Sequence, residues 1–207
     1  MKLTAFTRLS TLLLTSAVIL SGALAQNSMP GMDMSTPSAS SSSMPGMTMS
    51  TGSTDTTATL TKLSGKAFDR AFLSMMIPHH QAALDMARAV LPTTKDAQVR
   101  RWAQGIIASQ QAEIMTMTAL LRPLGGADAK MGAMMDGMKG MGGMVKAAKT
   151  PDLAFVQGMV PHHSSAIDMA NVALQRSADP KVLKLAQTIV VAQAKEMYEF
   201  RTWLLKK

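Results

Sequence analysis

The sequence predicts an all-α protein in which two repeated helical hairpins pack into a four-helix bundle. Three observations support this prediction. A unit of about 60 residues occurs twice, each copy has the apolar spacing of two helices, and a long connection separates the copies. The same observations bring the histidines of the chain together and so point to a functional site.

A run of Met, an aliphatic residue, Pro, His and His occurs twice in the chain. It stands at residues 76–80 and again at residues 159–163, an offset of 83 (162 − 79). Without a gap, the same offset pairs Asp69 with Asp152, Phe72 with Phe155, Gln110 with Gln193 and Glu113 with Glu196. The chain therefore contains an internal repeat, with the first copy at residues 65–122 and the second at residues 151–205.

Each copy has the sequence signals of two helices. Polar residues recur at helical spacing before Pro92, which ends the first run. In the second copy, Asp179 suits an N-cap and Pro180 suits the first helical position. We expect helices at residues 66–91, 96–122, 152–176 and 180–205. Two such hairpins in one chain make a four-helix bundle.

The connection between the copies, residues 123–150, is rich in glycine and methionine. It is long enough to cross from one end of the bundle to the other, whereas a simple up-and-down bundle needs only short loops. We therefore expect a ferritin-like topology for the bundle domain, residues 61–207.

The first 60 residues are expected to lie outside the bundle. Two basic residues precede an apolar run at residues 12–20, and a small-x-small cleavage site follows at residues 23–25. This pattern is typical of a secretory signal peptide, residues 1–25, and the run is too short to span a membrane. Residues 26–60 are rich in Ser, Thr, Gly, Pro and Met and are predicted to be disordered. The mature protein is thus expected in the periplasm or outside the cell.

The composition excludes several kinds of site. The chain has no cysteine, so it has neither a disulfide framework nor thiolate ligands. Its formal net charge is +8, but the basic residues are scattered and do not alternate with aromatic residues, which disfavours nucleic-acid binding. No later stretch is apolar for long enough to cross a membrane. The chain has 21 methionines, and their thioether sulfur is the only soft metal ligand that it offers.

All four histidines of the chain lie in the two Pro-His-His motifs, on helix faces that are otherwise apolar. Each motif has a methionine three residues before its first histidine and another seven residues after it. Imidazole together with thioether suits copper, above all Cu(I), although other metals could bind. The predicted metal ligands are His79, His80, His162, His163, Met76, Met86, Met159 and Met169. Adjacent helical residues point about 100° apart, so which histidine of each pair binds the metal is left open.

The second helix of each copy carries one Gln and one Glu on its apolar stripe: Gln110, Glu113, Gln193 and Glu196. A buried carboxylate without a partner is costly, so the core should hold either a metal site or a closed hydrogen-bond network. The helical rise places Glu113 about 9 Å beyond His79 along the axis. A shared metal within one hairpin is therefore disfavoured, and these residues are expected to support the ligands or to meet the other hairpin.

Further methionines are candidates for flexible capture of metal ions. In the N-terminal segment a Met-Pro-Gly-Met-x-Met unit occurs twice, and the connection between the copies adds six more methionines. The alternative is a tether with incidental methionines. The auxiliary candidates are Met29, Met32, Met34, Met44, Met47, Met49, Met131, Met134, Met135, Met138, Met141 and Met144.

The elements Met-Ile-Pro-His-His-Gln-Ala-Ala-Leu-Asp-Met-Ala and Gln-Gln-Ala-Glu-Ile-Met closely resemble the bacterial family called domain of unknown function 305. The resemblance covers both copies, about residues 65–205. It implies a ferritin-like helical bundle, usually exported, with copper binding and copper resistance in some members. It carries over to the four histidines and to the four methionines of the two motifs.

The function expected from the sequence is Cu(I) sequestration or handover in copper homeostasis or resistance. Its partners would be metal ions and another copper-handling protein. One alternative is a ferritin-like metalloenzyme that oxidises a metal or a small substrate, which the scarcity of core carboxylates disfavours. The other is a metal-free, stress-related binding module with a structural histidine cluster.

Overall fold

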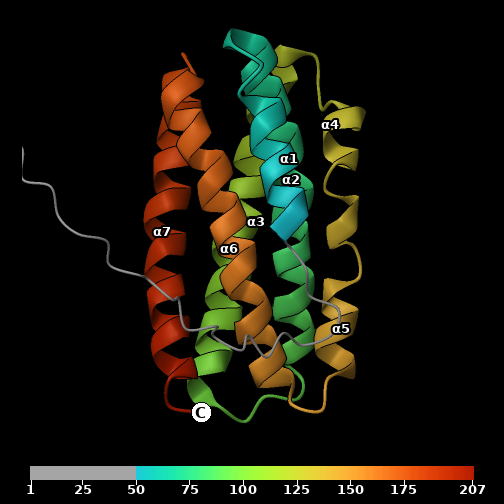
Figure 1. The fold of residues 1–207 in the computed structure, drawn as a ribbon, viewed down its shortest axis with the longest axis vertical. Coiled ribbons are helices and arrows are strands. Elements are labelled where there is room, and N and C mark those ends of the chain that lie inside the picture. The colour runs from blue at the N-terminus through green and yellow to red at the C-terminus, as the bar shows by residue number, and fades with distance from the viewer. Residues whose placement is uncertain (1–49) are drawn as a thin grey trace, which may run out of the picture. The chain divides into compact units, whose positions relative to one another are not determined.

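A computed structural model describes residues 50–207, with side chains from residue 55 onward. This part of the chain is all-α and contains no strand (Figure 1). The helices are α1 (Ser50–Leu60), α2 (Gly65–Val90), α3 (Ala97–Leu121), α4 (Ala129–Ala133), α5 (Met141–Ala147), α6 (Pro151–Arg176) and α7 (Pro180–Leu204), with short 3-10 turns at η1 (Arg122–Leu124) and η2 (Asp136–Met138). Within residues 50–207, no helix is long and apolar enough to cross a membrane.

The four long helices confirm the predicted ranges to within one residue at each end. The Asp96 carboxylate accepts hydrogen bonds from the first-turn amides of α3, and that of Asp179 accepts one from the first turn of α7. These side chains satisfy amide groups that have no partner within the helix. The N-cap predicted at Asp179 is confirmed, and Asp96, where the second helix of the first copy was expected to begin, has the same role.

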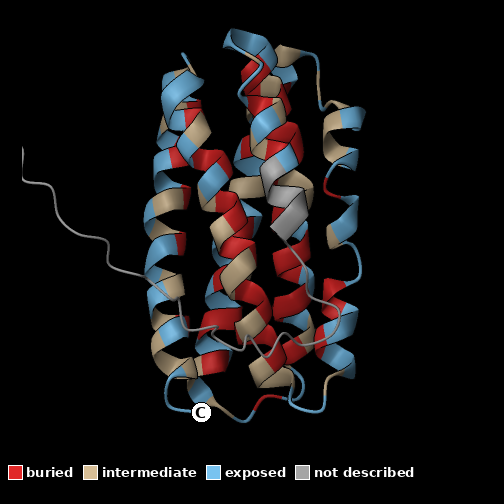
Figure 2. Ribbon diagram, in the orientation of Figure 1, coloured by how far each residue is buried: buried red, intermediate tan, exposed pale blue. Residues whose placement is uncertain are grey.

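The two hairpins share one interior. α2 packs against α3, α6 packs against α7, and the hairpins meet mainly through α2 and α6. These two inner helices carry most of the buried residues (Figure 2). That the four long helices form a four-helix bundle, and that its topology is ferritin-like, stay predictions.

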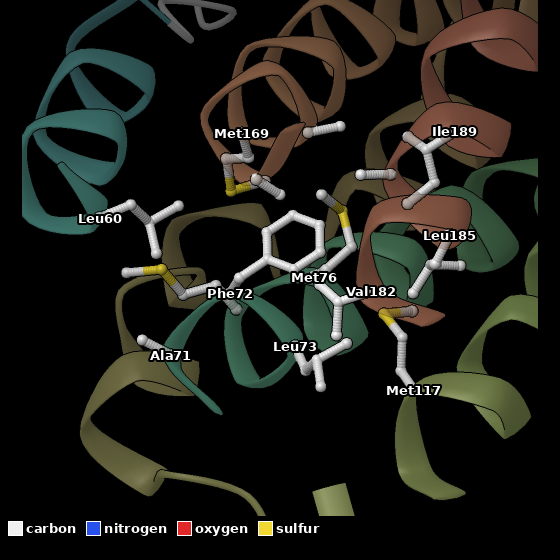
Figure 3. Close-up of a cluster of buried hydrophobic side chains, with 14 of the residues drawn as sticks. Leu60, Ala71, Phe72, Leu73, Met76, Met117, Met169, Val182, Leu185 and Ile189 are labelled. Carbon is white, nitrogen blue, oxygen red and sulfur yellow. The ribbon is translucent and has the colours of Figure 1, made fainter. Parts of the chain in front are cut away.

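The expected disorder of residues 26–60 is wrong for its last part. α1 covers residues 50–60 and packs against α6 and α2. Leu60 is fully buried in a cluster with Phe72 and Met169 (Figure 3). A polar composition predicted disorder here, but α1 buries Thr56 and Leu60, and these contacts order the segment. The rest of the predicted disordered segment, its methionine units and the predicted signal peptide lie outside the described residues.

The connection between the hairpins is also not the flexible arm that we expected. α4, η2 and α5 lie along α2. Met135 and Met141 are buried, and Met131 and Met138 pack partly buried against the core. Most of these methionines therefore fill space between helices, while Met134 and Met144 are exposed.

The glycines of this connection allow helices to approach closely. On Gly142 of α5, an added Cβ would stand 2.7 Å from the carbonyl oxygen of Asp85 in α2. On Gly143, the next residue, an added Cβ would meet nothing within 4 Å. Glycine composition suggested flexibility, whereas at Gly142 the missing side chain permits contact with the backbone of α2.

This difference gives a matched pair of substitutions. Gly142→Ala should lower the free energy of unfolding by about 1–3 kcal/mol, because α5 must move away from α2. Gly143→Ala should raise it by up to about 1 kcal/mol, because alanine favours the helix. Urea unfolding of both variants measures the difference, and equal effects would show that α5 does not pack as described.

Candidate metal centre

The four histidines lie at the interface of the two inner helices, and none of them is exposed to solvent. His79 of α2 faces His162 of α6, with 3.9 Å between the ring centroids. The rings within each pair are farther apart, 6.3 Å for His79 and His80 and 6.0 Å for His162 and His163. The first histidine of each motif therefore meets its counterpart, while the second points elsewhere, as the helical angle between neighbours requires.

The second histidine of each pair contacts the glutamate of its own hairpin. His80 Nε2 lies 2.7 Å from Glu113 Oε2, and His163 Nε2 lies 2.7 Å from Glu196 Oε2. The carboxylates reach toward solvent, since the Glu113 and Glu196 side chains are 13% and 23% exposed. In both copies, therefore, a histidine on the otherwise apolar face of the first helix contacts the glutamate on the apolar stripe of the second helix.

The contact has Glu113 supporting a histidine of its own hairpin, which is one of the two roles expected for it, although the helical rise had placed it about 9 Å beyond His79 along the axis. That estimate used the helical rise alone. Side chains on a helix lean toward its N-terminus, so in an antiparallel hairpin the side chains of α2 and α3 lean in opposite directions. His80 leans away from the connecting loop and Glu113 leans toward it, which brings their ends to one level.

The hydrogen bonds leave imidazole nitrogens free in a consistent way. The Nε2 atoms of His80 and His163 face carboxylates, and His162 Nε2 lies 2.9 Å from the carbonyl oxygen of His79. These oxygens accept, so Nε2–H donates, and a neutral imidazole in this orientation keeps the lone pair on Nδ1. All three Nδ1 atoms are buried without a hydrogen-bond partner, as are both ring nitrogens of His79.

Burial keeps the two facing histidines neutral. It lowers the pKa of His162 from 6.5 to about 3, and the neighbouring His163 adds to the shift. The pKa of His79 is also well below 6.5, first because of burial and then because of the three other histidines. A neutral imidazole can bind a metal without first releasing a proton.

Two further side chains leave polar atoms unpaired in the core. Gln110 and Gln193 are both buried, and Gln110 Oε1 and both amide atoms of Gln193 have no partner. Buried polar atoms are normally hydrogen-bonded. Unpaired atoms in the helices whose glutamates contact the histidines are what a site for a bound ion or for ordered water requires.

The four predicted methionine ligands are all fully buried, but they fall into two groups. Met76 and Met169 belong to one apolar cluster, where they lie close to Phe72 (Figure 3), and Met86 and Met159 belong to another. Each cluster thus combines one methionine from each copy. Among residues 55–207, no three His, Asp or Glu side chains are arranged as a ready metal cage.

Sequence reasoning missed two neighbours of the histidines. One is the backbone carbonyl of His79, which accepts from His162. The other is Phe200, whose ring centroid lies 5.6 Å from that of His163. Position 200 pairs with Met117 under the repeat offset, so the sequence contained a signal for an asymmetry at this point.

Comparison with known proteins identifies the family. The profile described as Domain of unknown function (DUF305) matches residues 17–121 and 152–207. The chain belongs to the DUF305 family. Uncharacterized protein L153 of Acanthamoeba polyphaga mimivirus is 42% identical over 53 residues, which are 26% of this chain and 35% of L153. The match thus spans about a third of the length of that relative.

Solved structures resemble this chain as well. CopM in the Cu(I)-bound form is 27% identical, and the match covers 67% of this chain and 96% of CopM at a TM-score of 0.56. CopM has also been solved in Ag-bound and Cu(II)-bound forms, each with a TM-score of 0.57. A DUF305 fragment from Deinococcus radiodurans is 26% identical, covering 67% of this chain and 96% of the fragment at a TM-score of 0.58.

Proposed function

We propose that this DUF305 protein binds Cu(I) between its two hairpins and sequesters it or hands it on in copper homeostasis. The observation that carries this proposal is the state of the buried histidines. Three of them have Nε2 on an oxygen acceptor and a free Nδ1, and His79 has both nitrogens free. Histidines that bind metals typically donate their other ring N–H to a carboxylate or a backbone carbonyl in this way.

In this proposal, His79 and His162 bind the ion from opposite hairpins. Glu113 and Glu196 orient His80 and His163 so that Nδ1 points away from the carboxylate. The buried methionines would supply thioether sulfur after small side-chain movements. Two-coordinate or three-coordinate sites with nitrogen and sulfur ligands suit Cu(I), which is soft and carries a single charge.

The two alternative functions receive less support. A ferritin-like metalloenzyme would need carboxylates at the metal, but Glu113 and Glu196 contact histidines instead. A purely structural network would pair its polar atoms, whereas five imidazole nitrogens lie buried without a partner. The copper-bound and silver-bound forms of CopM favour a soft metal ion for this chain as well.

Export remains part of the proposal. The N-terminal pattern of basic residues, apolar run and cleavage site would direct the chain to the periplasm or outside the cell. There the methionine units before α1 would capture copper ions, with exposed Met134 and Met144 as further contacts. Another copper-handling protein would then be the natural donor or acceptor.

The test is a Cu(I) competition titration with a chromophoric chelator. Three proteins are compared: residues 26–207, the same chain with all four histidines replaced by alanine, and residues 50–207. The last begins at α1 because α1 packs against the bundle. We expect the histidine variant to lose the bundle site, and residues 50–207 to bind fewer ions but to keep that site.

Metal selectivity and pH add two readouts. Ag(I) should compete with Cu(I), whereas Zn(II) should bind weakly because it gains little from thioether. Binding to the bundle should weaken at low pH, because protons compete for imidazole but not for methionine. Unchanged stoichiometry and affinity in the four-histidine variant would refute the site and favour a structural histidine cluster.

A further inference from the structure

A file of aromatic rings leads from the histidines to the surface. The ring centroid of Phe200 lies 5.6 Å from that of His163 and 5.0 Å from that of Trp102. The ring centroid of Trp102 in turn lies 6.4 Å from that of Trp203, and these are the only two tryptophans of the chain. Trp203 is partly exposed and lines a surface cleft of about 400 Å³. The file therefore joins a fully buried site to solvent.

The internal repeat shows that packing alone does not require these rings. The 83-residue offset pairs Trp102 with Leu185, Phe200 with Met117 and Trp203 with Leu120. Burial is the same at the paired positions: Phe200 and Met117 are fully buried, and Trp102 and Leu185 are nearly so. Two leucines and a methionine thus stand at the equivalent positions of the other copy. The aromatic residues beside His163 supply a property other than volume.

Both indole N–H groups donate to carboxylates. Trp102 Nε1 lies 2.7 Å from Glu199 Oε2, and Trp203 Nε1 lies 3.0 Å from Asp96 Oδ2. An indole that loses one electron becomes a much stronger N–H acid, and the carboxylate already bonded to Nε1 can share its proton. The negative charge of the carboxylate thus offsets the positive charge of the oxidised indole, which would be costly inside the protein without a partner.

We propose that Phe200, Trp102 and Trp203 form an electron-transfer relay between the copper site at His163 and one-electron oxidants in solution. The proposal rests on the copper site described above. An oxidant in the cleft takes one electron from Trp203, whose indole proton is then shared with the Asp96 carboxylate. An electron from Cu(I) then passes by way of Phe200 and Trp102 to Trp203, and the proton is again held by the indole nitrogen. The net change is one Cu(I) oxidised to Cu(II) and one oxidant reduced by one electron.

The relay would serve a site that oxidants cannot reach directly, since none of the four histidines is exposed. Without it, an electron would have to leave through side chains that lack an aromatic ring, such as those at the equivalent positions of the other copy. The order of the relay follows from burial, with Trp203 at the surface end and Trp102 inside.

The first test uses metal-free protein and photogenerated ruthenium(III) tris(bipyridine) as the oxidant. Transient absorption should detect tryptophan radicals in residues 26–207. In Trp203→Leu, the radical yield at buried Trp102 should fall, because its route to the oxidant is lost. An unchanged yield would overturn the proposed order. Tyr198→Phe is the matched control, because Tyr198 is an exposed aromatic residue of α7 outside the file.

The second test loads the protein with Cu(I) or with Ag(I), which occupies a soft site but does not give up an electron under these conditions. Cu(I) should shorten the tryptophan-radical lifetime and produce a Cu(II) signal in electron paramagnetic resonance, whereas Ag(I) should leave the radicals long-lived. In the double variant Trp102→Leu and Trp203→Leu, Cu(II) should form much more slowly. Leucine stands at the equivalent position of each tryptophan, at Leu185 for Trp102 and at Leu120 for Trp203, so this change should fit the fold.

The outcomes separate the relay from the copper site. Equal Cu(II) formation in the double variant and the wild type would refute the relay while leaving the copper stoichiometry intact. A chain that binds no Cu(I) in the chelator titration would refute the proposed function and the copper end of the relay. The metal-free experiment would then still decide whether Trp203 oxidises Trp102.

Discussion

Acidification should destabilise the metal-free protein well before its carboxylates titrate. His79 and His162 are buried and neutral, and their pKa values in the folded state lie far below 6.5, with that of His162 at about 3. An unfolded chain takes up these protons at ordinary histidine pKa values. The stabilising effect of the neutral form is therefore complete above pH 6.5 and is lost progressively as the pH falls from 6.5 toward 3.

The expected slope is about 1.4 kcal/mol per pH unit for each of these two histidines. The free energy of unfolding should thus fall by several kcal/mol between neutral pH and about pH 4.5, a large part of a typical domain's stability. Urea unfolding across this range measures the slope. The carboxyl groups of Asp96 and Glu199, whose pKa values are lowered, contribute only at more acidic pH. A stability that stays flat between pH 6.5 and 4.5 would show that the histidines are not buried as described.

Two neighbouring substitutions should change stability in opposite directions. His79→Leu removes two buried ring nitrogens that have no partner, so the metal-free variant should gain about 1–3 kcal/mol in free energy of unfolding. The backbone carbonyl that His162 contacts is kept. His80→Leu leaves the mostly buried Glu113 carboxylate without its imidazole, and the free energy of unfolding should fall by about 1–3 kcal/mol.

Both substitutions should weaken Cu(I) binding. Only in His79→Leu should the free energy of unfolding rise while the affinity for Cu(I) falls. A residue that lowers stability while supporting binding is typical of a functional site. The measurements are thermal or urea unfolding without metal and the chelator titration with Cu(I). Loss of stability in His79→Leu would indicate that His79 has an internal partner and a structural role.

The long helices were predictable because their signals are local. Pro92, the N-cap Asp179 and the apolar spacing between them depend only on neighbouring residues. α1 was missed because its polar residues resemble a disordered segment, and its order depends on contacts with α2 and α6 that are distant in the sequence. Gly142 was misinterpreted for a related reason, since flexibility and close helix contact both favour glycine and only the position of α2 distinguishes them.

The histidines and glutamates were predictable as residues but not as partners. Repeat and periodicity placed His79, His80 and Glu113 in the core. Which histidine faces the other hairpin depends on how α2 and α6 are rotated against each other, and this rotation is set by packing along both helices. The contact between His80 and Glu113 also depended on the lean of side chains, which a count of residues along the axis leaves out.

The meeting of His79 with His162 has a consequence for assembly. The two residues hold the same place in the repeat, so their contact has the form of an isologous interface, in which a residue touches its own counterpart. A protein with one hairpin would have to dimerise to form this layer of facing histidines, and the dimer would then dissociate on dilution. Covalent linkage of the two halves makes the layer independent of protein concentration. Linkage also allows the sequences of the two halves to differ. Only His162 therefore bonds to the backbone of its counterpart, His79, and the aromatic ring of Phe200 lies beside His163 in the second half.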